Sequence, residues 1–310
     1  MSQYFDDKDL FVGPKVEQYG SHVVMTGVQR ETKVKLLNVD TLFRDDYNSS
    51  TLIDYNITFP ETITNVKSIY VADMEIPIGY YIISENLQNN TFTLTEYPPL
   101  KEPKDIVITV PDGEYDRKNG IDYGSDLIEQ LNAQFVEAGI GDIHYSIEGN
   151  KSVFKNIGPS RFEFNFAVDS DGNFNKNLFR SRLGYILGFR TPTLILDPIN
   201  AQSSPAFVNL LGPKYLFLVI EELNGQGNEN SFVSYLPYSQ INKNILARLS
   251  MDGVKYSFNT MHIKDVTSDM RKYNGPKDIK RINVKIINEF GQIMDLNGHD
   301  ISFCLRIEYV

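Results

Sequence analysis

The stretch that most constrains the fold is the end of the printed sequence, where two segments alternate between apolar and polar residues. Asp300–Val310 reads D-I-S-F-C-L-R-I-E-Y-V, so every second side chain is large and apolar. Arg281–Phe290 reads R-I-N-V-K-I-I-N-E-F and begins with the same alternation. A period of two indicates half-buried strands of an antiparallel sheet. Asn297-Gly298 lies between them and favours a tight turn, so we predict a two-stranded ribbon around which the fold is built.

The composition suits pleated, half-buried surfaces. The chain contains 19 Phe and 18 Tyr. Its length of 310 residues allows one large all-β domain or two ordinary domains. The net charge of -10 argues against wrapping of nucleic acid, so we expect no specific nucleic-acid binding. No apolar run approaches the roughly 18 residues of a membrane span, and the acidic N-terminal segment does not resemble a signal peptide. We therefore expect a soluble protein that is made in the cytosol.

Cys304 is the only cysteine, which excludes a disulfide within the chain and fits a reducing compartment. Since it lies between the inward-facing residues Phe303 and Leu305, it is expected to face the opposite side of its strand. We interpret it as an inert, buried packing thiol.

The first half of the chain divides into an arm and a series of strands. Residues 1–33 show no sustained period, which predicts an extended N-terminal arm that orders against a neighbour; a plain disordered terminus is the alternative. A β-sandwich domain is expected over residues 34–310. Its first predicted elements are strands at Lys35–Arg44, at Asp54–Phe59 with Pro60 as its end, and at Val66–Pro77, then a hairpin at Asn86–Tyr97.

Residues at about 100–200 are expected to form an inserted region that carries the helices. Ser125–Ala138 has Leu127, Ile128, Leu131 and Phe135 at helical spacing, with Ser125 as a candidate N-cap and Gly139 as the stop. A second short helix is predicted near Asn177–Gly188. Beyond the insertion, Tyr215–Leu223 is almost continuously apolar, which predicts a strand buried on both faces.

Motifs that could carry chemistry are weak throughout. Gly225-Gln226-Gly227 resembles part of a phosphate cradle but lacks the third glycine, the lysine and the helix of one, so a surface loop is favoured. Asp169–Asn173 spaces oxygen atoms like the start of a calcium loop, but Gly172 comes too early and Arg180 stands where the closing Glu belongs, so a solvated turn is favoured. The histidines do not share a zinc-binding spacing; they are His22, His144, His262 and His299.

Two groups of charged residues also have simple structural interpretations. Asp73 and Glu75 share one face of a predicted strand and are expected to face solvent. Arg44, Asp45 and Asp46 follow the first predicted strand and favour a local ion pair or turn cap. We therefore nominate no catalytic, cofactor-binding or metal-binding residue, and we expect neither an enzyme nor a cofactor.

Four segments, taken in order, resemble one protein family. They are Leu37–Tyr47 (L-N-V-D-T-L-F-R-D-D-Y) with the following D-Y-N-I-T-F-P and N-V-K-S-I-Y-V-A-D-M-E-I-P, then I-V-I-T-V-P-D-G-E-Y-D leading into a helix with L-I-E-Q-L-N, then Y-L-F-L-V-I-E-E-L-N, and finally the segment Asp278–Tyr309. Together they resemble the jelly-roll capsid proteins of large icosahedral double-stranded DNA viruses.

The resemblance implies an all-β fold, a single antiparallel jelly-roll sandwich with a loop- and helix-containing insertion. It implies a structural virion protein of the capsid, as a penton subunit that forms homopentamers at the fivefold vertex and contacts neighbouring major and minor capsid proteins. A minor capsid or cement protein between capsomers is the alternative within the family. Outside it, a carbohydrate- or receptor-binding sandwich would use exposed aromatics such as Tyr235, Tyr238 and Tyr256, and a sandwich enzyme would need paired carboxylates.

Overall fold

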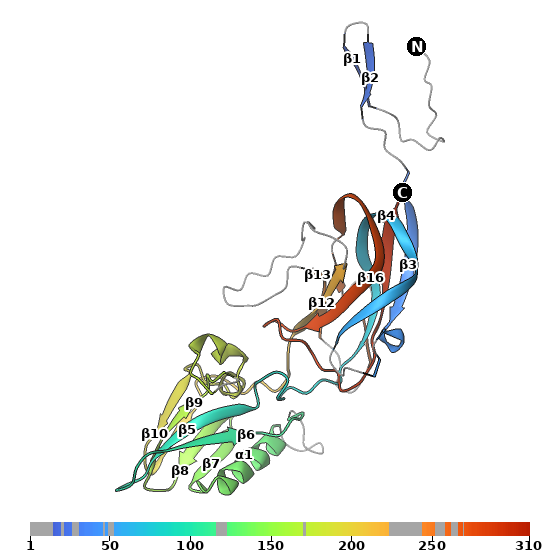
Figure 1. Ribbon diagram of the computed structural model, residues 1–310. Coiled ribbons are helices and arrows are strands. Elements are labelled where there is room, and N and C mark those ends of the chain that lie inside the picture. Colours follow the sequence, from blue (N-terminus) through green and yellow to red (C-terminus); the bar gives the residue numbers. More distant parts are fainter. Residues whose placement is uncertain are drawn as a thin grey trace.

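The computed structural model describes residues 15–19, 22–26, 31–45, 47–48, 53–115, 123–169, 172–222, 244–251, 258–261, 266–268 and 270–310. Over these residues the fold is all-β with antiparallel pairing throughout, as the sequence predicted. The described residues form two bodies, and each body has its own hydrophobic core (Figure 1). The first body contains the strands from both ends of the chain, and the second contains the middle.

The first body is a jelly roll made of two layers that share one strand. That strand is β4 (Asp54–Pro77), whose beginning pairs with β16 (Arg271–Ile287) and whose end pairs with β17 (Ser302–Tyr309). In one layer the order is β3 (Lys33–Asp40), β17, the end of β4, and β14 (Phe258–Met261). In the other it is the start of β4, β16, β12 (Tyr215–Glu222) and β13 (Ile245–Ser250), and β15 (Val266–Ser268) joins the edge of β13.

One core fills the space between these layers. Side chains from β4, β12, β13, β16 and β17 all belong to it, and representative members are Tyr55, Leu218, Leu249, Val284 and Leu305. Strands of both layers therefore turn their apolar face to the same interior, as in sandwiches generally. The alternating residues of the last strand point inward as predicted, since Phe303, Leu305 and Ile307 are all buried.

The predicted terminal hairpin is wrong. β16 and β17 are both strands, but β4 lies between them in the sheet, and the connection from residue 288 to residue 301 crosses from one layer to the other. Asn297 and Gly298 both have positive φ values, so the predicted turn exists, at 53° and 76°. A turn signal shows where the chain reverses locally, but the choice of strand partner depends on the long β4, which is distant in sequence.

The prediction that Pro60 ends a strand is also wrong, because β4 runs through it from Asp54 to Pro77. Proline lacks the N–H that a ladder needs, and in strands it occurs at edges and bulges. Here the pairing with β16 shifts register between Arg281, opposite Thr58, and Ile279, opposite Ile63. Pro60 falls inside this irregular stretch, where the ladder does not require its missing donor.

The second body has a core of its own between residues 82 and 210. Its strands form two small sheets, β10-β9-β5-β6 and β11-β8-β7. The elements are β5 (Thr91–Tyr97), β6 (Lys104–Thr109), α1 (Ser125–Glu137), β7 (Ile143–Glu148), β8 (Lys151–Asn156), β9 (Arg161–Asn165), η2 (Lys176–Ser181), α2 (Leu183–Ile186), β10 (Thr193–Leu196) and β11 (Asn200–Ser203).

Helix α1 confirms the strongest helical pattern in the sequence. Leu127, Leu131 and Phe135 are fully buried in the second core, and Gly139 follows the helix with a φ of 77°. Gly124, not Ser125, is the N-cap. The hairpin predicted at Asn86–Tyr97 is wrong: residues 85–88 form a turn, and β5 pairs with β6 and β9 instead.

Strand β12 confirms the prediction of burial on both faces. Leu216, Leu218 and Ile220 face the jelly-roll core, while Phe217 and Val219 belong to a small cluster on the other side.

Cys304 is only partly buried, so the expectation of a buried thiol is wrong. It pairs with Asn38 and Asp73 on the outward face of its layer.

Within the predicted arm of residues 1–33, the described part is a hairpin of β1 (Lys15–Tyr19) and β2 (His22–Thr26), and Lys33 begins β3. Most of the remaining arm lies outside the described residues. The division into an arm of residues 1–33 and a domain of residues 34–310 stays a prediction, as does the inserted region at about 100–200.

The aromatic cluster of the second core gives a test of this architecture. Phe154 is fully buried and lies 4.8 Å from Phe164 and 5.6 Å from Phe189, measured between ring centroids. Phe154→Ala should lower the free energy of unfolding by about 3–5 kcal/mol in urea denaturation, because it leaves a cavity among rigid rings. Ile157→Ala is the matched control, since this side chain is 53% exposed and should change stability by less than about 0.5 kcal/mol. Equal losses would contradict the described core.

Candidate functional site

Several residues singled out in the sequence lie outside the described residues. These are Asp46, the Gly225-Gln226-Gly227 loop, Tyr235, Tyr238, Tyr256 and His262. The backbone of His22 lies in β2, and its side chain is not described. The phosphate-cradle and aromatic-loop hypotheses therefore stay untested.

The remaining candidates lie far from one another. Asp73 and Glu75 are exposed on the outward face of β4, where Asp73 accepts a hydrogen bond from the N–H of Met74 and Glu75 accepts one from the Ser302 hydroxyl. Asp169 accepts the N–H of Asn173 at 2.9 Å. No group of three or more His, Cys, Asp or Glu side chains that could hold a metal ion occurs in the described part of the chain, and no described helix is long and apolar enough to cross a membrane.

The sequence favoured a local ion pair or turn cap at Arg44, but the ion pair that the structure describes joins Arg44 to Asp300, which is distant in sequence. Nη1 of Arg44 lies 2.6 Å from Oδ1 of Asp300 and 2.8 Å from the carbonyl of Thr41, and its guanidinium stacks on the ring of Tyr47 at 4.2 Å. The contacts tie the η1 turn (Thr41–Phe43) to the segment that leads into β17. Asp45 accepts from Thr58 and pairs with Arg281 at 3.3 Å, which fixes the same corner to β4 and β16.

This corner presents an apolar strip to solvent. Strand β3 is the last strand of its sheet, and its outward-facing Leu36 is 65% exposed. Phe43, in the adjoining η1 turn, is 76% exposed. We call the set the edge strip; it consists of Val34, Leu36, Leu42, Phe43 and Tyr47. An uncovered sheet edge next to large apolar side chains is typical of a surface that another chain covers.

A buried group of charged residues lies inside the jelly roll. Arg271 donates to Oε1 of Glu222 at 2.8 Å and to the carbonyls of Ile220 and Asn244, both at 2.7 Å. The Tyr273 hydroxyl also donates to Glu222, and the ammonium of Lys277 lies 3.5 Å from its second oxygen. Burial acts to raise the pKa of Glu222, but the neighbouring Arg271, Tyr273 and Lys277 outweigh it and hold the pKa below its ordinary value. The group fastens β16 to the ends of β12 and β13.

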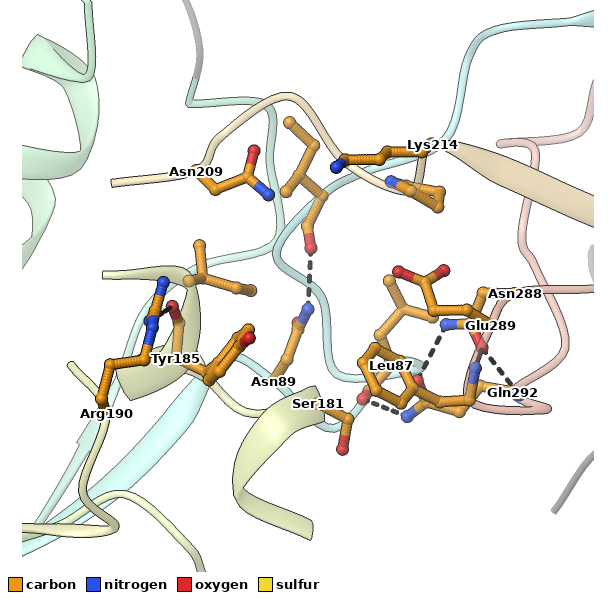
Figure 2. A pocket seen from close by; sticks show the side chains of 15 residues that line it. Leu87, Asn89, Ser181, Tyr185, Arg190, Asn209, Lys214, Asn288, Glu289 and Gln292 are labelled. Carbon is orange, nitrogen blue, oxygen red and sulfur yellow. Dashed lines mark hydrogen bonds between the residues drawn. The ribbon is translucent and has the colours of Figure 1, made fainter. Parts of the chain in front are cut away.

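A pocket lies at the junction of the two bodies (Figure 2). It has a volume of about 310 Å³. Four segments line it, namely residues 82–89 after β4, residues 181–190 around α2, residues 209–214 before β12, and residues 288–292 after β16. We call it the junction pocket. Gln292 joins two of these segments, because its Nε2 donates to the carbonyl of Leu87 at 2.6 Å.

Glu289 is the ionisable group in this pocket whose environment is most unusual. Its Oε2 is buried and has no hydrogen-bond partner among the described residues. Burial raises the pKa of the carboxyl above its ordinary value, and its own backbone N–H and the positive charge of Lys214 offset this only partly. Figure 2 shows Lys214 and Glu289 on one side of the pocket and Arg190 on the other.

Comparison with known proteins finds a likeness among solved structures but not among sequences. No family model matches the chain, and no curated protein matches it. Among solved structures, it is similar to the crystal structure of the mavirus penton protein, at 12% identity over 91% of this chain and 100% of that chain, with a TM-score of 0.42. At this identity and score, the assignment of the jelly roll rests on the strand order described above.

Sequence reasoning did not find the junction pocket or the buried charged group. Glu289 lies in N-E-F-G-Q, which reads as an ordinary turn, and Lys214 follows a Gly-Pro pair. The two are brought together only because β12 and β16 are neighbours in the sheet. The apolar spacing of β3 did contain a signal for the edge strip, since Val34 and Leu36 stand on the face opposite to Val39.

The buried group predicts a dependence of stability on pH. Since the pKa of Glu222 is lowered in the folded state, its contribution is present above its ordinary value of 4.5 and is lost as the pH falls through the folded value. Glu222→Gln leaves Arg271 buried without a counter-charge and should cost about 3–5 kcal/mol at pH 7, measured by urea unfolding. The loss should shrink as the pH is lowered below 4.5. Glu221→Gln, whose partner Lys285 is partly exposed, is the control and should cost under about 1 kcal/mol.

The raised pKa of Glu289 predicts a dependence of stability on pH that is opposite in sign to that of Glu222. Its raised pKa means that the folded state favours the protonated form, so ionisation destabilises the protein as the pH rises above 4.5. Glu289→Gln should therefore raise the melting temperature at pH 7–8, and the gain should fall towards zero below about pH 4. Melting curves across this pH range measure both. A variant that is less stable than the parent at pH 8 would contradict the geometry of this side chain.

Proposed function

We propose that this protein is a structural virion protein of a large double-stranded DNA virus. In this proposal it is a penton subunit of the icosahedral capsid shell, and five copies form a homopentamer at each fivefold vertex. The observation that carries the proposal is the jelly roll itself, whose edge strand β3 and η1 corner present the edge strip to solvent. The order of the four sequence segments that resemble such capsid proteins supports the same role. The protein is proposed to act without catalysis and without a cofactor.

Among the described residues, no strand pairs with the outer edge of β3. A strand at the end of a sheet has one row of backbone N–H and C=O groups without a strand partner, and soluble proteins usually protect such edges with charge, proline or a covering segment. β3 carries Lys33 and Lys35, but its other face presents the exposed Val34 and Leu36, and the exposed Phe43 follows in η1. In a ring, the edge of each copy meets a different surface of the next copy, and the contact closes by rotation. A permanent contact of this kind buries about 2,000 Å² or more.

The N-terminal segment fits an assembled state. β1 and β2 pair only with each other in the described strand pairing, and an isolated two-stranded hairpin is marginally stable in water. We propose that residues 1–33 are an arm that orders against a neighbouring subunit or another capsid protein. Residues 34–310 are then the jelly-roll domain with its inserted second body, located in the virion shell next to major and minor capsid proteins.

The edge strip can be tested by changing one side chain. Leu36→Lys places a charge in the proposed contact and should turn an assembled ring into monomers, because an unpaired buried charge costs several kcal/mol in each contact. Val107→Lys is the matched control, since Val107 is 64% exposed on the edge strand β6 of the second body. Val107→Lys should leave the mass of the assembled protein unchanged. Sedimentation or light scattering gives the mass of each variant.

The result separates the candidate roles. A pentameric parent that Leu36→Lys dissociates supports the vertex role. A monomeric parent that binds to isolated capsomers through the same strip would replace it with the minor capsid or cement role. A monomeric parent that does neither contradicts both.

A further inference from the structure

Exposed apolar side chains gather at one end of the second body. Leu100, in the turn between β5 and β6, is fully exposed, and Ile199, in the turn between β10 and β11, is 83% exposed. Three further exposed side chains lie at the end of β5, in the last turn of α1, and in the loop between β8 and β9. We call the set the distal tip; it consists of Tyr97, Leu100, Val136, Ile157 and Ile199.

The strand pairing brings these segments to the same end. The end of β5 lies opposite the start of β9, because Tyr97 pairs with Arg161. The end of β8 lies opposite the start of β11, because Asn156 pairs with Asn200. Asn156 also pairs with Ile143, which begins β7 shortly after the end of α1. Figure 1 shows the turn after β5 and the end of α1 at the end of the second body that points away from the jelly roll.

Buried polar contacts hold the turns of the distal tip in place. The side chain of Asn156 is almost fully buried, and its Nδ2 donates to the carbonyls of Ser160 and Asp197 at 2.7 and 3.0 Å. These two bonds join the loop after β8 to the turn after β10. The Ser160 hydroxyl donates to Glu96 in β5 at 2.7 Å, which ties in the third segment. The apolar side chains therefore project from a preorganised base.

Two residues of the distal tip have a backbone conformation that suits glycine or asparagine better. The φ value is 64° at Leu100 and 49° at Ile199. This left-handed region is unfavourable for a residue with a Cβ atom, and most unfavourable for a β-branched one. Burial does not compensate here, since both side chains are exposed. Large apolar side chains at these two positions therefore indicate a contact outside the chain.

The form of the distal tip favours a lipid surface over a protein partner. Its apolar side chains come from four different segments, and no two are neighbours in sequence. A protein partner would need a matching socket for each of them, whereas the fluid interior of a bilayer accepts side chains of any shape. Because the tip lies at the end of the second body, a flat surface can meet it without meeting the jelly roll (Figure 1).

The charged and aromatic residues of these segments indicate the kind of lipid. The guanidinium of Arg161 lies over the ring of Tyr97, 5.3 Å from its centre, and tyrosine is enriched where a bilayer meets water. Over residues 97–103, 136–142, 157–161 and 197–199 acids outnumber bases; they are Glu102, Glu137, Asp142 and Asp197 against Lys101 and Arg161. With a net charge of -10, the chain is repelled by an anionic bilayer but not by a zwitterionic one.

We propose that the distal tip binds the surface of a zwitterionic lipid bilayer. Leu100, Ile199, Ile157 and Val136 enter the boundary between head groups and acyl chains, and Tyr97 lies at the level of the head groups. The binding is peripheral and reversible, since a few apolar side chains give far less affinity than a spanning segment. The proposal is independent of the assembly role, because the distal tip shares no residue with the edge strip.

A single tryptophan can report the insertion, because the chain contains none. Leu100→Trp should shift its fluorescence emission to shorter wavelength when phosphatidylcholine vesicles are added to the full chain, since the indole leaves water. Leu211→Trp is the matched control, because Leu211 is also exposed but lies in the linker that leads into β12. It should show no shift. No shift at position 100, or the same shift at both positions, overturns the proposal.

Asparagine variants separate the lipid contact from the fold. Asparagine adopts a positive φ more readily than leucine or isoleucine, so Leu100→Asn and Ile199→Asn should keep or raise the melting temperature. Each should nevertheless weaken binding to phosphatidylcholine vesicles about ten-fold, measured by flotation, because one inserted apolar side chain is lost. Leu211→Asn should leave the binding unchanged. Tip variants that bind as well as the parent contradict the proposal.

Two other results would assign the distal tip a different partner and overturn the proposal. Binding that occurs only when phosphatidylglycerol is added to the vesicles would mean attraction by charge and not insertion. A loss of assembled mass in Leu100→Asn, measured by light scattering, would mean that the tip joins copies of this chain. Leu36→Lys tests the assembly role separately, so a failure of the lipid contact leaves that role standing.

Discussion

The whole structure depends on one strand that belongs to both layers of the jelly roll. β4 extends from Asp54 to Pro77, and a strand of this length can stay in contact with one core only by bending around it. Its inward positions show how it does so. They are Tyr55, Phe59 and Ile63, then Val66, then Ile69 and Val71, and finally Met74 and Ile76. The parity of the inward residues changes three times along the strand, and register shifts in its pairing with β16 and β17 fall in the same region. An extra residue at a bulge reverses which face a side chain occupies, so the shifts keep the apolar residues inside while the strand turns.

The bend also explains what the sequence can and cannot predict. Helix α1 and strand β12 follow from local pattern alone, because Leu127, Leu131 and Phe135 lie on one helical face and β12 is apolar on both sides. β4 does not, because a strand whose parity changes looks like several short strands with breaks between them. The same reasoning placed β16 and β17 together, since adjacent strands in sequence usually pair. Their separation by β4 is a long-range choice, made by a core to which all three contribute. No spacing within thirty residues contains that information.

The candidate sites were less predictable than the fold for a related reason. The edge strip could be anticipated in part, because Leu36 and Phe43 are close in sequence and β3 shows which of its faces is apolar. The junction pocket draws on four segments that span residues 82 to 292, and no local pattern in the sequence indicates that they meet. The buried group around Glu222 likewise joins the end of β12 to the beginning of β16, 49 residues apart. Groups of this kind exist only once the strand order is known.

The position of the second body follows from the same strand order. The chain leaves the jelly roll at Pro77, where β4 ends, and returns at Tyr215, where β12 begins. β16 pairs with both strands, so the loop after it reaches the place where the two linkers meet. Gln292 in this loop then donates to Leu87 in one linker, and the positive charge of Lys214 in the other lowers the pKa of Glu289, partly offsetting the effect of burial.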